Sequence, residues 1–372
     1  MATVFGWNYR KSLVPGARAA ITEVLAVRKN ERILIITNPD KELSEISTAL
    51  YDSVLEAKAI PVLIFQREKA QFDFAEEEVI KAIATNPDAT ISISKDRLGK
   101  DGFGLKHGYK GKRRYDHVFD LLYEEAKMRA FWSPGVTVDM FCRTVPIDYT
   151  RMRADAFRLN RIIEISDRVR VTAPGGTDIT VGVRGRKPRA DDGNFTKPGR
   201  AGNVPSGETY VSPTLGTAHG TIAFDASMVL NEGEVIIKNP IMAEVEGGFI
   251  TAVTGGKEAT MLLESIREGE RKARMMGKAG QLSQSSAKKY ARNAWSIGEL
   301  GVGLNRNARI VANMLEDEKV YGTCHFAVGS NYDGDADAMI HLDGLVNSPT
   351  ICALDGSGRE RQLMVDGRLV WD

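Results

Sequence analysis

Hydrophobic positions follow two alternating patterns through the first part of the chain. Continuous apolar runs of strand length end in turn-forming or charged residues at 32–40, 60–66 and 89–95. Between these runs, apolar residues recur at the three- and four-residue spacing of an amphipathic helix, over 17–28, 41–59 and 74–86. Apolar strands that alternate with helices are typical of a parallel sheet covered on both faces. Residues 1–165 are therefore predicted to form a doubly wound α/β domain.

The pattern changes after residue 165. A helical segment at 146–168 leads out of the first domain. Beyond it, alternating apolar and polar positions broken by Gly, Pro and Asn predict short strands at 169–185, 219–230, 233–240, 243–256 and 321–329. A helical stretch rich in Lys, Arg, Ala and Glu interrupts them at 257–294. Residues 166–372 are therefore predicted to form a predominantly antiparallel β domain with a helical insertion.

The composition excludes several classes of protein. Hydrophobic residues make up 42% and charged residues 27% of the 372 residues, the profile of a soluble globular protein. Because 50 Lys and Arg residues balance 49 Asp and Glu residues, the chain has no excess positive charge for nucleic acid or an anionic membrane. The three cysteines form no CxxC pair, which fits a reducing compartment. With no secretory signal and no long apolar run, a cytoplasmic protein is expected.

Two glycine-containing loops invite ligand-binding interpretations. The basic loop at 95–114 lacks GxxxxGK[ST], and its glycines miss GxGxxG by one residue, so a solvated loop is favoured over a phosphate cradle. The acidic loop that begins at Asp333 opens like a calcium loop. That motif requires Gly at its sixth position and Glu at its twelfth, where Ala338 and Gly344 stand. A calcium loop is therefore excluded.

A histidine and an aspartate in "MIHLDGLV" are the first candidates for a metal site. Residues two apart on a β-strand project from the same face, so His341 and Asp343 can reach one divalent ion. Their neighbours are apolar, and a buried carboxylate needs either a metal or a salt-bridge partner. His325, in the strand-like run "YGTCHFAVG", strengthens the metal interpretation, although a lone histidine there can also be a hydrogen-bonded core residue.

Two glutamates stand out by their surroundings. Glu299 lies in the small, apolar run "SIGELGVGLN", where flanking glycines allow a backbone to approach closely. Glu208 follows a turn at the start of a predicted strand in "NVPSGETYVSP". Taken singly, each glutamate could be salt-bridged or solvated.

The segments that carry these residues resemble the aminopeptidase T family of metallopeptidases, which includes the staphylococcal aminopeptidase S. The resemblance runs in order through roughly residues 165–372 and is weaker in the N-terminal domain. It implies two divalent ions (Zn, Co or Mn), an α/β domain joined to a β-rich metal domain, and a homodimer. The implied metal ligands are Glu208, Glu299, His325, His341 and Asp343. Tyr332, seven residues beyond His325, matches a further active-site residue of that family.

A second family shares this scaffold, the iron-dependent dioxygenases that open 2,5-dihydroxypyridine. Its likeness covers "EGGFITAVTGGKEATML" and the final His-x-Asp, but its members carry histidine where Glu299 stands and lack the glutamate that matches Glu208. The presence of both glutamates and His325 favours the hydrolase. The alternatives are a mononuclear Fe(II) ring-cleaving dioxygenase and a non-catalytic protein stabilised by metal.

The expected function is that of a metallo-aminopeptidase that hydrolyses the N-terminal peptide bond of small peptides. Two ions that share a bridging carboxylate, Glu299 or Asp343, would activate a water molecule for attack on the peptide carbonyl. Tyr332 would hydrogen-bond the developing oxyanion. Glu318, close to His325 in sequence, is the candidate general base.

Overall fold

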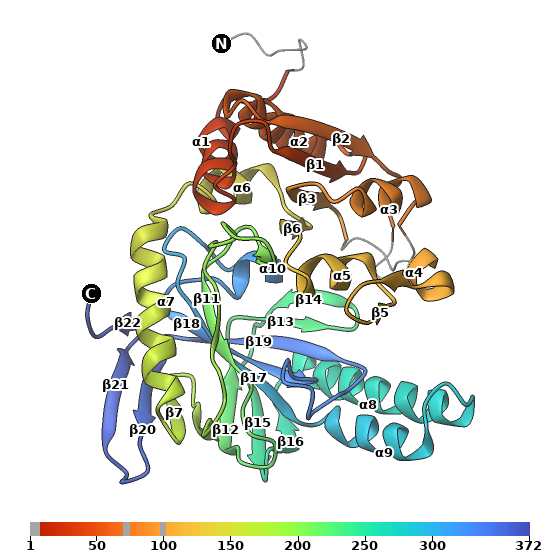
Figure 1. The fold of residues 1–372 in the computed structure, drawn as a ribbon. Coiled ribbons are helices and arrows are strands. Elements are labelled where there is room, and N and C mark those ends of the chain that lie inside the picture. Colours follow the sequence, from red (N-terminus) through yellow and green to blue (C-terminus); the bar gives the residue numbers. More distant parts are fainter. Residues whose placement is uncertain (1–7, 70–74, 97–101) are drawn as a thin grey trace. The chain divides into compact units, whose positions relative to one another are not determined.

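The computed structural model describes residues 8–69, 75–96 and 102–372 (Figure 1). The glycine-rich basic loop predicted at 95–114 therefore lies partly outside the described residues. The chain divides into two compact units, Met1–Arg153 with Asp191–Ser206, and Ala154–Ala190 with Gly207–Asp372. No helix among the described residues is both long enough and apolar enough to cross a bilayer.

The first unit is built on a parallel sheet of five strands in the order β10-β6-β3-β1-β2. Its central strand β3 is buried at every position, and β1 at every position but the first, which explains their unbroken apolar sequences. The strands are β1 (Arg32–Thr37), β2 (Ile60–Phe65), β3 (Ala89–Ser94), β6 (Arg129–Pro134) and β10 (Ala201–Asn203). A separate two-stranded ribbon consists of β4 (Tyr109–Lys110) and β5 (Arg114–Tyr115).

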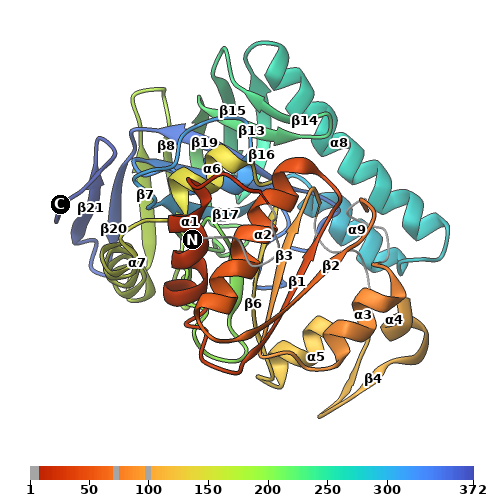
Figure 2. The same cartoon turned by 90° about the horizontal axis from the view of Figure 1, so that it is seen from above.

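Helices cover both faces of this sheet (Figure 2). On one face α1 (Leu13–Ala19), continued by a π-helical turn at Ala20–Val24, packs with α2 (Lys41–Glu56) and α6 (Val138–Thr144). On the other face α3 (Glu77–Ala84) and α5 (Val118–Glu124) enclose a second apolar core, and α4 (Gly102–His107) follows nearby. This arrangement confirms the predicted doubly wound α/β domain.

The second unit contains two antiparallel sheets. The seven-stranded sheet has the order β14-β13-β19-β18-β17-β11-β9, and the eight-stranded sheet the order β16-β15-β12-β8-β7-β20-β21-β22. The first consists of β9 (Arg189–Asp191), β11 (Glu208–Val211), β13 (Ser227–Leu230), β14 (Gly233–Ile236), β17 (Ile297–Gly303), β18 (Thr323–Gly329) and β19 (His341–Asn347). The second consists of β7 (Arg168–Thr172), β8 (Asp178–Gly182), β12 (His219–Phe224), β15 (Ile241–Glu246), β16 (Phe249–Thr254), β20 (Thr350–Leu354), β21 (Glu360–Val365) and β22 (Arg368–Leu369). The predicted predominantly antiparallel β domain is thereby confirmed.

The two sheets of this unit meet where β19 contacts β12. A Cβ atom added to Gly344 of β19 would lie 2.5 Å from the ring of Phe224 in β12, so the backbone of one strand lies directly on the side chain of the other. Strands β17 and β18 are buried at every position. A strand covered on both faces usually carries small or apolar residues. The buried polar residues Glu299 on β17 and His325 on β18 therefore need polar or charged partners.

Four helices complete the second unit. The long helix α7 (Tyr149–Glu164) carries the chain into it, and the short helix α10 (Met314–Asp317) precedes β18. The predicted insertion is a pair of packed helices, α8 (Lys257–Lys278) and α9 (Gln284–Asn293), next to β16 (Figure 1). Gly277 allows the pair to approach closely, because a Cβ atom there would fall 2.5 Å from that of Ala287.

Candidate metal centre

Four neighbouring strands bring the predicted ligand residues into one part of the seven-stranded sheet. Glu208 begins β11, Glu299 lies on β17, His325 lies on β18, and His341 and Asp343 lie on β19. These strands are adjacent in the order β19-β18-β17-β11, and Gly301 pairs directly with His325. Residues distant in sequence therefore converge because their strands pair.

Three of the five residues form a compact group. The Nε2 atom of His325 lies 3.1 Å from Oε1 of Glu299 and 3.4 Å from Oε2 of Glu208. One ligand atom from each residue lies within 4.8 Å of the other two. Atoms bound to one ion at about 2.1 Å are separated by roughly 3–4 Å, so this spacing suits a shared cation.

The other two residues adjoin this group. The Nε2 atom of His341 lies 3.4 Å from Oδ1 of Asp343 and 3.8 Å from Oε2 of Glu299. The Nδ1 atom of His341 lies 2.8 Å from the carbonyl oxygen of Ser330, to which it can donate, leaving Nε2 free to accept or bind metal. Glu299 thus presents one oxygen to each imidazole.

Two glycines of β17 create the space for this cluster. Glu299, Gly301 and Gly303 alternate along the strand and share one face. A Cβ atom at Gly301 would fall 2.0 Å from Nε2 of His325, and one at Gly303 would fall 2.0 Å from the carbonyl oxygen of Val320. Gly301 and Gly303, which follow Glu299 on the same face of the strand, therefore leave room for an imidazole and for a neighbouring chain segment.

Several buried polar atoms of the cluster lack a hydrogen-bond partner. They are Oε2 of Glu208, Oε2 of Glu299, Nδ1 of His325 and Oδ1 of Asp343. Because burying an unsatisfied polar group is costly, such a concentration indicates a missing partner of opposite charge. Carboxylate oxygen and imidazole nitrogen are donors that suit divalent first-row metals, so the residues fit a bound cation.

Proton equilibria in the cluster are strongly displaced. Burial raises the pKa of Glu208 to about 8. Burial alone would lower the pKa of both imidazoles, but the neighbouring carboxylates outweigh it and raise the pKa of His325 to about 9 and that of His341 to about 10. Burial opposes ionisation of Asp343, yet His341 lowers its pKa to about 2. The metal-free cluster therefore holds protons at positions that a cation would take.

Tyr332 lies on the loop between β18 and β19 and is half exposed. Its ring packs against the imidazole of His341, with 5.2 Å between centroids, and against Tyr210 at 5.4 Å. Arginines fix this loop, since Arg186 binds Asp333 and Asp335, and a guanidinium nitrogen of Arg189 donates to the backbone oxygen of Tyr332. The acidic loop that begins at Asp333 and opens like a calcium loop is thus held by ion pairs to arginines, and these ion pairs fix the position of Tyr332.

One charged residue of the cluster escaped sequence reasoning. Lys319 is completely buried, and its ammonium contacts both Glu208 and Glu318. In the sequence it belongs to the charged run "EDEKVYG", which resembles a solvated surface segment, so no local signal identifies it. Glu318, the candidate general base, is therefore ion-paired with this lysine.

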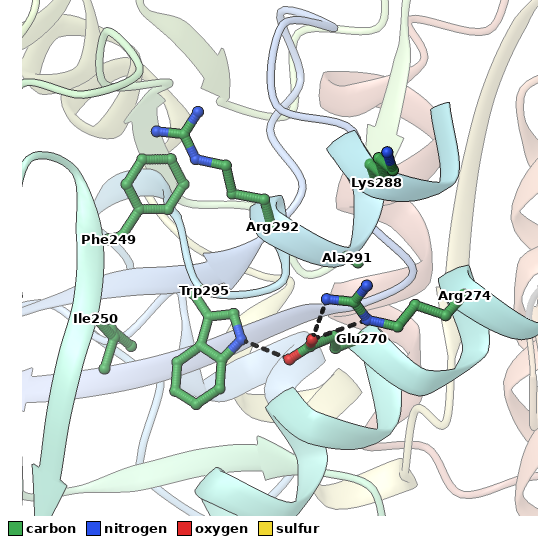
Figure 3. Close-up of a pocket in the computed structure, with 8 residues that line it drawn as sticks. All are labelled: Phe249, Ile250, Glu270, Arg274, Lys288, Ala291, Arg292 and Trp295. Atoms are coloured by element: carbon green, nitrogen blue, oxygen red, sulfur yellow. Dashed lines mark hydrogen bonds and ion pairs between the residues drawn. The ribbon is translucent and has the colours of Figure 1, made fainter. Parts of the chain in front are cut away.

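A separate pocket of about 490 Å³ lies among β16, α8 and α9 (Figure 3). The indole nitrogen of Trp295 donates to Glu270, and Arg274 binds the same carboxylate. The guanidinium of Arg292 stacks over the ring of Phe249 at 4.4 Å. None of the predicted metal ligands lines this pocket, so it is distinct from the metal centre.

Comparisons with known proteins show that this chain shares its fold with a dioxygenase and with an aminopeptidase T. The family model for 2,5-dihydroxypyridine 5,6-dioxygenase, NicX, matches residues 18–370. A 2,5-dihydroxypyridine 5,6-dioxygenase from Pseudomonas putida is 24% identical over 219 residues, which are 55% of each chain. The match therefore spans about half the length of this curated relative.

Two solved structures share the fold. The structure of the 2,5-dihydroxypyridine dioxygenase from Pseudomonas putida KT2440 has a TM-score of 0.69 at 14% identity and covers 96% of this chain and 97% of that one. AmpT from Thermus thermophilus has a TM-score of 0.64 at 15% identity, with 97% and 99% covered. At sequence identities this low, these two structures show only that this chain has the same fold.

The family match overturns the predicted metallo-aminopeptidase. The matched family is named for a dioxygenase, an oxidoreductase, so the expectations of a hydrolase, of peptidase activity and of proteolysis are wrong. The error has a physical cause. Imidazole and carboxylate ligands bind the metals of hydrolases and of oxygenases alike, so the right donors in the right order do not select the reaction. The ligand residues indicate a metal-binding protein, but they do not distinguish between these two activities.

The presence of Glu208, Glu299 and His325 therefore does not distinguish a hydrolase from a dioxygenase. Because the family model extends over nearly the whole sequence, this chain belongs to the 2,5-dihydroxypyridine 5,6-dioxygenase family.

Proposed function

We propose that this protein is an Fe(II)-dependent dioxygenase that opens the ring of a dihydroxylated pyridine or a closely related aromatic compound. The family match over residues 18–370 supports this activity. The structural observation that carries it is the convergence of the imidazoles of His325 and His341 on the carboxylate of Glu299. Two histidines and one carboxylate are the ligand set typical of non-haem Fe(II) oxygenases.

We infer that His325, His341 and Glu299 are the principal ligands. Glu299 is the one carboxylate with an oxygen directed at each imidazole, at 3.1 and 3.8 Å. Asp343 lies 3.4 Å from Nε2 of His341 and can either complete the ligand set or orient that imidazole. In the sequence resemblance, relatives carry histidine where Glu299 stands, and His325 would supply the second imidazole in this chain.

Fe(II) held by His325, His341 and Glu299 would supply the activation of O₂. The protein's part is to bind and orient a flat ring beside that centre. Tyr332 and Tyr210 form an aromatic wall next to His341, and offset or edge-to-face packing on such a wall suits a pyridine ring. The dioxygenase proposal thus gives the half-exposed Tyr332 a direct role.

Proton transfer would fall to residues around the same wall. Although about half of the Tyr332 side chain is exposed, desolvation on its packed side and the charges of Glu299 and Asp343 raise its pKa, so the hydroxyl stays protonated and can donate to a substrate oxygen. Glu318 also contributes to this shift and is held by Lys319. It remains our candidate to accept a proton from a substrate hydroxyl.

The test is oxygen uptake by protein loaded with Fe(II) under anaerobic conditions and then mixed with 2,5-dihydroxypyridine and air-saturated buffer. We expect one O₂ consumed per ring opened, followed by the loss of the ring's ultraviolet absorbance. Glu299→Ala should abolish uptake and reduce bound iron, whereas the exposed control Glu232→Ala should retain both. Full activity in Glu299→Ala would contradict the ligand assignment.

A further inference from the structure

Lys319 stands apart from the other lysines that the structure describes because no part of it reaches solvent. Its Nζ atom lies 2.6 Å from Oε1 of Glu208 and also contacts a carboxylate oxygen of Glu318. A buried ammonium is tolerated only when carboxylates of this kind surround it. Lys319 is therefore an internal cation of the metal centre rather than a surface charge.

The backbone holds this lysine in place from two sides. The amide of Lys319 donates to the carbonyl of Glu316 at the end of α10, at 2.9 Å. Its carbonyl accepts from the amide of Asn305 at 2.8 Å, just beyond β17. Gly303 makes this approach possible, because a Cβ atom there would fall 2.8 Å from the carbonyl carbon of Lys319. The ammonium is thus aimed into the cluster by fixed main chain.

Glu208 is shared between two cationic positions. Its Oε1 atom binds Lys319, while its Oε2 atom lies 3.4 Å from Nε2 of His325 and has no hydrogen-bond partner. In a two-metal site, ions about 3.5–4 Å apart would have to share such carboxylates. Here one oxygen of Glu208 is already bound to an ammonium at 2.6 Å, so a positive charge occupies the position beside that oxygen.

We propose that the ammonium of Lys319 takes the place of a second metal ion, so that this centre binds a single divalent ion although five ligand-type side chains converge. The inference rests on the proposed metal-dependent function and specifies its stoichiometry. It assigns Glu208 and Glu318 to the lysine, and leaves Glu299, His325 and His341 for the metal. Lys319 is accordingly a positioning residue that limits the centre to one ion.

The wild-type protein gives the first test. Metal-free protein is titrated with Mn²⁺, bound manganese is measured by elemental analysis, and the spin state is followed by electron paramagnetic resonance. We expect one Mn²⁺ per chain at saturation, with a mononuclear signal. Two ions with an exchange-coupled signal would overturn this inference and leave the proposed oxygenase activity to be judged by O₂ uptake. No specific binding would overturn both.

Variants at position 319 test the role of the ammonium itself. Lys319→Met removes the charge at similar length, and Lys319→Gln removes it while keeping hydrogen-bond donors. Either variant that folds should bind close to two Mn²⁺ per chain and show the coupled signal. The control Lys238→Met, at an exposed position, should still bind one. A folded position-319 variant that also binds only one Mn²⁺ would overturn the proposal.

Discussion

Gly301 offers a way to disturb the metal centre without removing any ligand. The residue lies opposite His325 in the paired strands β17 and β18, on the same face of β17 as Glu299. In Gly301→Ala the new methyl group would lie 2.0 Å from Nε2 and 2.1 Å from Cε1 of the imidazole. Ordinary contact begins near 3.4 Å, so the two groups must separate by about 1.4 Å.

This displacement is large compared with what a metal site tolerates. Ligands usually need to be held within about 0.5 Å of their working positions. Since disturbing even the supporting residues of a metal ligand typically costs about 10–100-fold in affinity, moving His325 itself should cost at least about tenfold. Overpacking should also reduce the free energy of unfolding by about 1–3 kcal/mol. The backbone at position 301 carries no positive φ, so the effect arises from packing.

The assay is metal affinity, measured by competition with a chromophoric chelator for Mn²⁺ or Fe(II), together with the melting temperature of the metal-free protein. Gly356→Ala is the matched control, because its methyl group would meet only the side-chain ends of Asp167 and Arg184, at 3.0 and 3.4 Å. We expect weaker metal binding in Gly301→Ala and unchanged binding in the control. Wild-type affinity in a folded Gly301→Ala protein would refute the assignment of His325 as a ligand.

Three further predictions concern protons, substrate and charge. With pKa values raised to about 9 and 10, His325 and His341 both carry a proton at pH 7 in the metal-free protein, and a metal must displace these protons. Because two protons are displaced, the affinity for Mn²⁺ should rise by up to about 100-fold per pH unit between pH 6 and 8 and level off above the higher pKa. Calorimetry that finds no such pH dependence would rule out these imidazoles as ligands. Tyr332→Ala should raise KM for the aromatic substrate by up to about tenfold through loss of ring packing, whereas Tyr332→Phe should preserve KM and lower kcat. If the two variants change KM equally in steady-state measurements of O₂ uptake, Tyr332 does not stack on the substrate. Metal-free Lys319→Met should lose about 3–5 kcal/mol of stability in denaturant unfolding, because the buried Glu208 and the partly buried Glu318 lose their shared counterion. Added Mn²⁺ should restore more of the melting temperature than in wild type, and an undiminished stability would mean that the lysine is dispensable.

Most of the fold could be predicted because its strands and helices have strong local patterns. The buried run that became β3 and the helix α8 both follow from hydrophobic spacing. The strand β10 could not be found in this way, since Ala201–Asn203 is too short and too polar to show a pattern, and it joins the parallel sheet only by pairing with β6. Long-range pairing decides such elements.

The convergence of the candidate residues could be predicted from the sequence, whereas the chemistry could not; their roles as metal ligands stay a prediction. Glu299 and His325 could be selected because polar residues inside apolar runs need a partner. Lys319 could not, because its burial depends on the approach of its backbone to Gly303 on β17. The reaction was predicted wrongly, since the same donors hold metals for hydrolysis and for oxygen chemistry. A homodimer remains a prediction from the family resemblance.

We propose that a single Fe(II) ion at His325, His341 and Glu299 supports ring opening by O₂. The most direct measurement combines bound iron with oxygen consumption in one anaerobically prepared sample supplied with 2,5-dihydroxypyridine. We expect about one iron per chain, and one O₂ consumed per ring opened, with no turnover until oxygen is admitted. Ring loss at the same rate without oxygen, or oxygen uptake that persists after complete removal of iron, would contradict it.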